Sequence, residues 1–143
     1  MLRSHWHVFD TIPDKKSRAG VSPKQQAFRD SLTMILASPA ISIHGFYCHA
    51  GQSYASTSLD EASQFLSAEL QTVNDAAEVA KSTIAQTNTA SSHSTPFVPS
   101  VGSTPTAHAA TPEKKAKLRS TLHGKLEIHA GARLTGLTEA NPG

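Results

Sequence analysis

Three features that the sequence has little of exclude several classes of protein. Only one cysteine occurs among the 143 residues, so no internal disulfide can form, as is typical of a reducing compartment. Charged residues make up 17% of the chain and the net charge is +2, too weak a charge to indicate nucleic-acid binding. No apolar run reaches the ~18 residues of a transmembrane helix, and the first residues lack the apolar segment of a signal peptide. We therefore expect a cytoplasmic protein whose partners include neither nucleic acid nor a membrane.

The apolar pattern predicts strands that alternate with helices. The expected order is strand 6–12, helix 22–36, strand 41–47, helix 58–81, strand 97–101, helix 112–122 and strand 125–129. Because each pair of strands is separated by a segment of helical length, we expect parallel strands joined by crossovers, which is an α/β fold. A polar stretch at about 86–95 has no apolar periodicity and predicts a flexible surface loop.

Capping residues mark the starts of the first two helices. Ser22 suits an N-cap, with Pro23 at the first helical position and Gln25 completing a capping box. Ser58 and Glu61 have the same spacing and predict the start of the second helix. In the strand expected at 97–101, Pro99 removes a donor from the hydrogen-bond ladder and makes this strand the least regular.

The length limits how much of a barrel the chain can form. A closed eight-stranded β/α barrel needs about 250 residues, so 143 residues supply roughly half of one. The outer strands of a partial barrel have unpaired edges, which favours pairing with another chain, for example as a homodimer.

Loops rich in glycine and polar residues follow three of the expected strands. They span residues 47–54, 102–106 and 129–131. Functional residues of β/α folds collect beyond the carboxyl ends of the strands, so we expect these loops to border a single pocket. The run Gly102-Ser103-Thr104 predicts either a phosphate cradle, built from backbone N–H groups and hydroxyls, or an ordinary surface turn.

Several side chains in these loops carry more than one interpretation. Tyr47 and Tyr54 are able to stack on a flat cofactor, or one belongs to the core while the other covers a loop. His49 and His129 raise the hypothesis of a metal site, but no Cys-x-x-Cys or His-Glu-x-x-His pattern supports it, and we expect no metal ligand. Cys48 is expected to be a small buried thiol rather than a nucleophile.

Three segments together resemble a known family. They are 45–54 (Gly-Phe-Tyr-Cys-His-Ala-Gly-Gln-Ser-Tyr), 100–106 (Ser-Val-Gly-Ser-Thr-Pro-Thr) and 126–131 (Leu-Glu-Ile-His-Ala-Gly). Their residues, order and spacing resemble D-serine dehydratase of the eukaryotic, alanine-racemase-like type, and 18–20 (Arg-Ala-Gly) is similar to a further segment of that family. The resemblance covers residues 6–131 and leaves 132–143 as a divergent tail.

The resemblance implies a pyridoxal-phosphate enzyme of fold type III, with a parallel β/α (TIM-type) barrel and a C-terminal β-domain. The family eliminates water from D-serine to give pyruvate and ammonia. By this resemblance residues 1–131 form part of the barrel, without its first strands and without the β-domain. Tyr47, Tyr54, Thr104 and Gly131 match cofactor-binding positions. The pyridine ring of this cofactor is an electron sink, so the protein has to fix the ring plane and anchor the phosphate.

The same resemblance implies that important groups of the family have no counterpart here. The Schiff-base lysine lies on the first barrel strand, before the Arg-Ala-Gly segment, and the zinc ligands, a histidine and a cysteine, lie in the C-terminal domain. We therefore expect no catalytic residue and no zinc ligand in this chain, and no dehydratase activity from this chain alone. Three alternatives stay open: a non-enzymatic truncated remnant, a D-threonine aldolase-like lyase, and an interaction module built on the loop at 86–95.

Overall fold

The computed structural model describes residues 20–87, 96–113, 116 and 124–129. The elements in chain order are α1 (Gln26–Leu36), β1 (Gly45–Cys48), the 3₁₀ helix η1 (Gly51–Ala55), α2 (Leu59–Thr87), β2 (Val98–Val101), α3 (Thr104–His108) and β3 (Glu127–Ile128). The strand expected at 6–12, most of the loop expected at 86–95, Gly131 and the tail at 132–143 lie outside these residues.

The three described strands form one parallel sheet in the order β1-β2-β3. The register pairs Tyr47 with Ser100, and Ser100 in turn with Glu127. Strands that follow one another in the chain are therefore neighbours in the sheet, as they are in the wall of a β/α barrel. The expected α/β class with parallel strands is confirmed.

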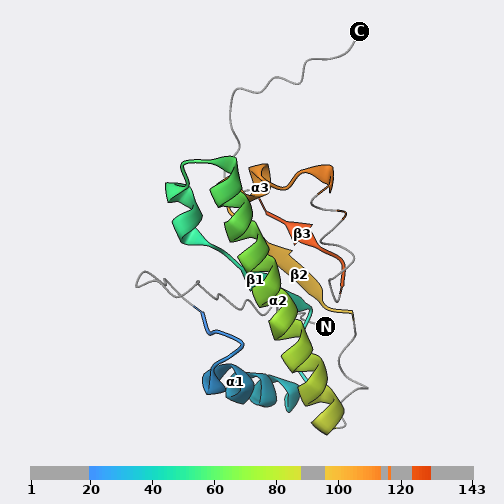
Figure 1. The fold of residues 1–143 in the computed structure, drawn as a ribbon. Helices are drawn as coiled ribbons and strands as arrows, with labels where there is room; N and C mark the ends of the chain where they lie inside the picture. Colours follow the sequence, from blue (N-terminus) through green and yellow to red (C-terminus); the bar gives the residue numbers. More distant parts are fainter. Residues whose placement is uncertain (1–19, 88–95, 114–115, 117–123, 130–143) are drawn as a thin grey trace.

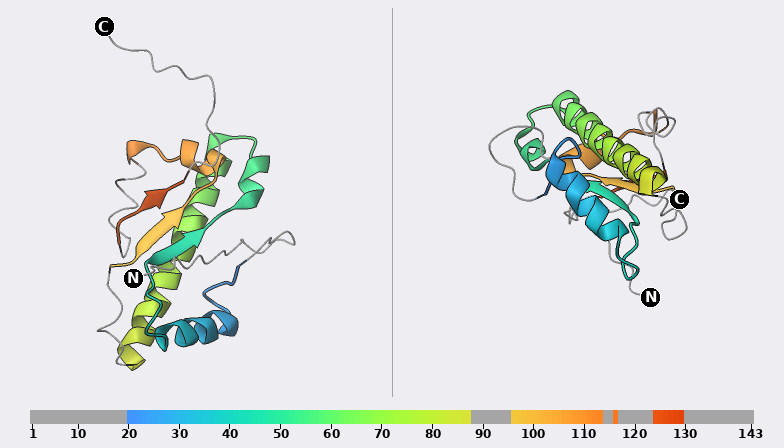
Figure 2. Two further views of the ribbon diagram at one scale, coloured as in Figure 1. Left: turned by 180° about the vertical axis from the view of Figure 1, so that it is seen from behind. Right: turned by 90° about the horizontal axis from the view of Figure 1, so that it is seen from below.

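The crossover helix α2 covers one face of the sheet (Figure 1). Seen from behind, the opposite face has no described helix over it (Figure 2). Side chains alternate along β1, so that Phe46 and Cys48 are buried in the core that α2 covers, while Tyr47 is only partly buried. The sheet therefore has a packed face and an open face, and the open face is the one that a barrel turns inward.

The core lies between α1, α2 and the packed face of the sheet. Phe28, Phe46 and Phe97 are almost fully buried, and their rings are in contact, with centroids 6.0 Å apart for the first pair and 5.3 Å for the second. Each such side chain stabilises the fold by about 1.5–3 kcal/mol through burial alone. The buried face of α2 consists of Ala62, Leu66, Glu69, Leu70, Val73, Ala76, Ala77, Ala80 and Ile84.

Pro99 lies within β2, but its missing N–H does not remove a hydrogen bond between neighbouring strands. The N–H of Val98 donates to the carbonyl of His44 (3.0 Å), so it points to the edge where β1 lies. Successive N–H groups alternate between the two edges of a strand, and the nitrogen of Pro99 therefore faces β3. Pairing with β3 begins at Ser100 and Glu127. The missing N–H of Pro99 therefore does not remove a hydrogen bond between β2 and β3.

The two predicted capping boxes have different outcomes. At α2 the hydroxyl of Ser58 accepts the N–H of Glu61 (3.1 Å), as predicted, but the Glu61 carboxylate reaches the N–H of Thr57 (2.8 Å), one residue earlier than expected. The box at Ser22 is wrong, because the Ser22 carbonyl accepts the N–H of Gln25 (3.0 Å) in a turn, and α1 begins only at Gln26.

Two helices differ from the prediction in extent. α2 continues past the expected end at Lys81 to Thr87, because Ile84 extends its buried face and the Thr83 and Thr87 hydroxyls bond to carbonyls one turn back. The short helix α3 was not predicted, because its sequence has the glycine, serine and proline of a turn. Of the helix expected at 112–122, the structure describes 112, 113 and 116, which are helical.

No helix in the described part of the chain is long and apolar enough to cross a membrane.

Candidate functional site

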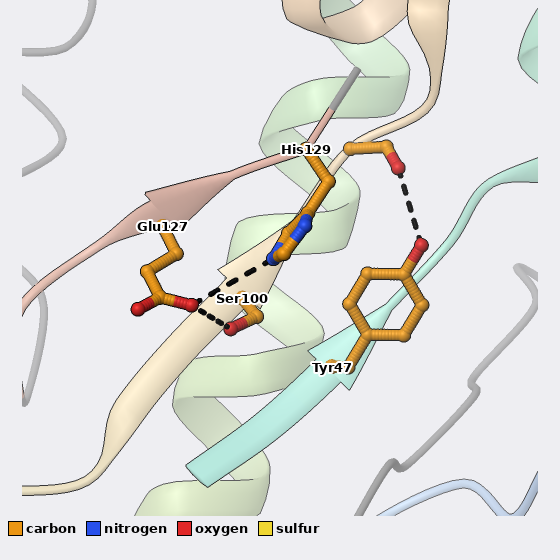
Figure 3. Close-up of polar contacts among 5 residues, drawn as sticks. Tyr47, Ser100, Glu127 and His129 are labelled. Carbon is orange, nitrogen blue, oxygen red and sulfur yellow. Dashed lines mark hydrogen bonds and ion pairs between the residues drawn. The ribbon is translucent and has the colours of Figure 1, made fainter. Parts of the chain in front are cut away.

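Side chains from all three strands meet on the open face of the sheet. Tyr47, Ser100 and Glu127 occupy paired positions on neighbouring strands, and His129 follows the end of β3 (Figure 3). The N–H of His129 donates to the carbonyl of Val101 (2.8 Å), which fixes the start of the third loop against the end of β2. The carboxyl ends of the strands therefore converge, as the sequence predicts.

A carboxylate joins the second and third strands. Glu127 Oε2 accepts the Ser100 hydroxyl (3.2 Å) and lies 3.7 Å from His129 Nε2. Both side chains are about half exposed (54% for His129 and 48% for Glu127), so water screens the attraction that a protonated His129 has for the carboxylate. The serine donates to the carboxylate rather than to the histidine, and hence this is not a nucleophile–base arrangement.

Tyr47 and His49 converge on one backbone carbonyl. The Tyr47 hydroxyl donates to the carbonyl of Gly102 (3.4 Å), and His49 Nδ1 lies 3.1 Å from the same oxygen and 3.3 Å from the Tyr47 hydroxyl. The Tyr47 ring also makes an edge contact with His129 (centroids 5.6 Å apart), and His49 packs against Tyr54 (6.1 Å). Aromatic rings from the first and third loops therefore border one polar area.

The Tyr47 phenol stays protonated at neutral pH. Burial raises the pKa of Tyr47 above its ordinary value of 10.0, and the nearby negative charge of Glu69 adds to the increase. A neutral phenol is able to donate its proton in a hydrogen bond, which is the role it has toward Gly102.

The loop after β2 is held by its own hydroxyls. Ser103 caps α3, with its N–H donating to Thr106 Oγ1 (2.8 Å) and its hydroxyl bonded to Thr106 (3.1 Å) and to Ser53 of η1. Thr104 Oγ1, in contrast, is buried and has no hydrogen-bond partner among the described residues. Of the predicted cradle Gly102-Ser103-Thr104, the threonine hydroxyl is thus the side-chain group left for a ligand.

A buried carboxyl group of α2, which sequence analysis missed, binds the backbone of the loop that follows β1. Glu69 lies on α2 with no exposed surface, and its Oε1 accepts the N–H of Ala50 (2.6 Å). Its Oε2 has no hydrogen-bond partner in the described part of the chain. Burial raises the pKa of Glu69 to about 7, although the hydrogen bond from the Ala50 N–H lowers it. The spacing from Leu66 and Val73 places Glu69 on the apolar face, and this was the available signal.

The predicted site residues have different placements. Tyr47 lies near the carboxyl end of β1, and Thr104 is the first residue of α3, three positions after β2 ends. Tyr54 lies in η1 and is 57% exposed, and Gly131 is outside the described residues. Cys48 is buried, as expected for a core thiol. Within residues 20–87, 96–113, 116 and 124–129, no group of three histidine, cysteine or acidic side chains is arranged to hold a metal ion.

Comparison with known proteins identifies the fold and the relatives. No family model matches the chain. D-serine dehydratase of Schizosaccharomyces pombe is 44% identical over 127 residues, which cover 88% of this chain and 28% of that protein. D-serine dehydratase of Saccharomyces cerevisiae is 34% identical over 133 residues, with 88% of this chain and 30% of that protein covered. The crystal structure of an alanine racemase-like protein from Idiomarina loihiensis matches with a TM-score of 0.53 and 22% identity, over 87% of this chain and 28% of that one.

The chain therefore forms part of an alanine-racemase-like fold, that is, fold type III. Within that fold type, the chain is a partial D-serine dehydratase-like protein. It spans less than a third of the length of the curated relatives that it matches.

Proposed function

We propose that this chain supplies part of the pyridoxal-phosphate site of a D-serine dehydratase-like lyase. The observation that carries the proposal is the identity of 44% with a D-serine dehydratase, across the segment that contains the converging strand ends. The cofactor positions proposed are Tyr47, Tyr54, Thr104 and Gly131, of which Tyr47 lies near the end of β1 and Thr104 begins α3, just after the neighbouring strand β2.

The described residues fit this cofactor in two respects. Pyridoxal phosphate carries a phosphate that needs hydrogen-bond donors, and Thr104 offers a buried hydroxyl without a protein partner. The cofactor also carries a flat ring, and the Tyr47 ring lies partly buried on the open face, beside the rings of His49 and His129. Aromatic faces of this kind fix the plane of a flat ligand by stacking or edge contact.

In this proposal the residues of the chain bind and orient, and they carry out no step of the reaction. Thr104 would donate to the phosphate, and Tyr47 would hold the flat ring by aromatic contact. When bound, pyridoxal phosphate supplies an electron sink for negative charge at the substrate α-carbon. The small-molecule D-amino acid would approach over the same open face, because α2 covers the other face of the sheet.

We further propose that the family reaction, elimination of water from D-serine to give pyruvate and ammonia, does not occur on this chain alone. In the family the Schiff-base lysine and the zinc ligands come from segments without counterparts in these 143 residues. A D-threonine aldolase-like lyase shares the fold type and the cofactor, and is the second candidate. A non-enzymatic remnant is the third, and it differs from the main proposal in not binding the cofactor. A cytoplasmic location also remains our proposal.

Cofactor binding is tested with pyridoxamine 5′-phosphate, which lacks an aldehyde and so cannot react with surface lysines. Calorimetric titration of the 143-residue chain should give saturable binding, and pyridoxamine, which lacks the phosphate, should bind more weakly. Equal binding of the two compounds, or no binding of either at millimolar concentration, would refute the proposal and leave the remnant.

Activity is tested separately, by measuring pyruvate from D-serine with pyridoxal phosphate added. We expect no pyruvate above the amount that the free cofactor produces. Pyruvate above that amount would contradict the proposed inactivity, and chelation of metals and substitution of each lysine would then show which groups of the chain it requires. Aldol cleavage of D-threonine, measured in parallel, distinguishes the aldolase-like alternative.

A further inference from the structure

The carbonyl of Gly102 is the point where the ends of β1 and β2 are joined by side chains. His49 Nδ1 lies 3.1 Å from this oxygen and the Tyr47 hydroxyl lies 3.4 Å from it. The two side chains are separated from Gly102 by more than fifty residues in the chain, so the contact is a true tertiary one. Gly102 has a φ of 126°, and a Cβ at this position would lie 2.4 Å from the carbonyl oxygen of His129. The glycine therefore lets its backbone approach the third loop closely.

The contacts of His49 favour one tautomer of its ring, the one with the proton on Nδ1. A carbonyl oxygen has lone pairs and no proton, so an Nδ1 atom 3.1 Å away has to be the donor. The Tyr47 oxygen, 3.3 Å from Nδ1, accepts the same proton as a weaker second partner, while its own O–H points to Gly102. With the proton on Nε2 instead, Nδ1 would be an acceptor for the Tyr47 O–H at 3.3 Å, and its lone pair would face the Gly102 carbonyl oxygen across 3.1 Å. The Gly102 carbonyl would then lose the donor at 3.1 Å and compete with Nδ1 for the Tyr47 O–H.

We propose that His49 is a positioning residue, which donates its Nδ1–H to the Gly102 carbonyl and thereby holds the Tyr47 ring at the mouth of the site. The His49 and Tyr47 rings are stacked, with centroids 6.3 Å apart and an angle of 23° between their planes. The stack and the shared carbonyl together fix both the plane of Tyr47 and the position of its hydroxyl. The functional part of this inference rests on the proposed function, because Tyr47 is a proposed cofactor contact.

The same geometry gives the Nε2 atom of His49 a role of its own. In the neutral ring with Nδ1 protonated, Nε2 carries a lone pair and is a hydrogen-bond acceptor. The edge of the ring that bears it lies toward Gly51, whose Cβ position is 4.0 Å from Cδ2 of His49. His49 therefore presents an acceptor near the start of η1, next to Tyr54.

The tautomer is measured directly on the ligand-free chain of 143 residues. With ¹⁵N-labelled histidine, long-range ¹H–¹⁵N correlations distinguish a protonated from an unprotonated ring nitrogen, and the His49 ring is assigned by correlation to its own backbone atoms. We expect Nδ1 to carry the proton in the neutral ring. A proton on Nε2, the form that free histidine prefers, would overturn the inference, and this measurement needs no variant.

The bond to Gly102 has its own probe, because Gly102-Ser103 is the only Gly-Ser pair in the sequence. Carbonyl-¹³C glycine combined with ¹⁵N serine gives a single HNCO peak, which reports the Gly102 carbonyl. In His49→Asn the amide nitrogen is one bond from Cγ, as Nδ1 is, so the carbonyl shift should stay near the wild-type value. In His49→Gln the donor is one atom too far along the side chain, and the carbonyl shift should move to lower frequency. A shift that is the same in both variants would contradict a specific bond to Nδ1.

Binding completes the test and separates the two proposals. We expect His49→Gln to weaken the binding of pyridoxamine 5′-phosphate about fivefold, the equivalent of one hydrogen bond, and His49→Asn to weaken it less. Equal weakening by both variants would overturn the positioning role. A chain that shows the Nδ1–H tautomer and the Gly102 bond but binds no pyridoxamine 5′-phosphate would refute the proposed function, and with it the functional part of this inference.

Discussion

At the scale of single residues, some groups of the candidate site could be predicted from the sequence and others could not. Tyr47 lies near the end of an apolar strand pattern and Thr104 lies three residues after another, so their place near the strand ends could be predicted. The Gly102 carbonyl is a backbone group, and no residue type marks it as the acceptor for two side chains. Glu69 was missed for a different reason, since a carboxyl group on an apolar helix face is expected to face water unless a partner such as the Ala50 N–H is known.

Glu69 should make the stability of the chain depend on pH. Burial raises the pKa of Glu69 from 4.5 to about 7, so the folded state binds this proton more tightly than the unfolded state does. The contribution of Glu69 to the free energy of unfolding is therefore fully present below pH 4.5. It is lost as the pH rises to about 7, and the total loss is roughly 3 kcal/mol. Urea unfolding across this range measures the loss. In Glu69→Gln the decrease should be absent, and an unchanged pH profile in that variant would show that another group is responsible.

Substitution of Gly102 tests the close approach of the second and third loops. Gly102→Ala places a Cβ 2.4 Å from the His129 carbonyl oxygen, at a φ of 126° that alanine rarely adopts. We expect a loss of at least about 2 kcal/mol in the free energy of unfolding, measured with urea. Gly51→Ala is the matched control, because its Cβ would have no neighbour nearer than 4.0 Å, and it should leave stability unchanged. Equal effects of the two substitutions would contradict the close approach.

At the scale of elements, one serine caps a helix and another, with the same sequence signature, does not. Ser58→Ala removes the acceptor of the Glu61 N–H at the start of α2 and should cost about 1 kcal/mol in urea unfolding. Ser22→Ala should cost clearly less, because the Ser22 hydroxyl accepts only the exposed N–H of Lys24 (3.3 Å) in a turn before α1. A larger loss at Ser22 than at Ser58 would show that α1 begins at the predicted box after all.

The elements themselves could be predicted wherever an apolar period was long enough. α1, α2, β1 and β2 overlap the expected segments, because their apolar residues recur at helical or strand spacing. The starts were less well predicted: β1 begins at Gly45 rather than at 41, and α1 at Gln26 rather than at 22. α3 has only five residues, and its stability comes from tertiary bonds of Ser103 and Thr106, which no local pattern reveals. Pro99 makes β2 harder to predict as a strand, because proline has no N–H to donate. In the observed register its nitrogen lies at a position where β2 is not yet paired with β3, so no hydrogen bond is lost.

At the scale of the whole molecule, the sheet is built as a segment of a larger one. In the part of the chain that the structure describes, β1 and β3 are the outer strands, and one face of the sheet has no helix over it. We expect the isolated chain to associate, as a homodimer in the simplest case, because exposed strand edges pair readily. Sedimentation velocity at micromolar concentration measures this, and a monomer at all concentrations would contradict it.

The central claim is that the converging strand ends form a phosphate-dependent cofactor site, and Thr104 tests it most directly. Thr104→Val keeps the shape of the side chain and removes the buried, unpartnered hydroxyl. Thr33→Val is the matched control, since its hydroxyl bonds to a carbonyl of its own helix α1. Calorimetry should show pyridoxamine 5′-phosphate binding about fivefold more weakly to Thr104→Val and unchanged in Thr33→Val, with pyridoxamine affected by neither. Unchanged binding of pyridoxamine 5′-phosphate to Thr104→Val would contradict the claim.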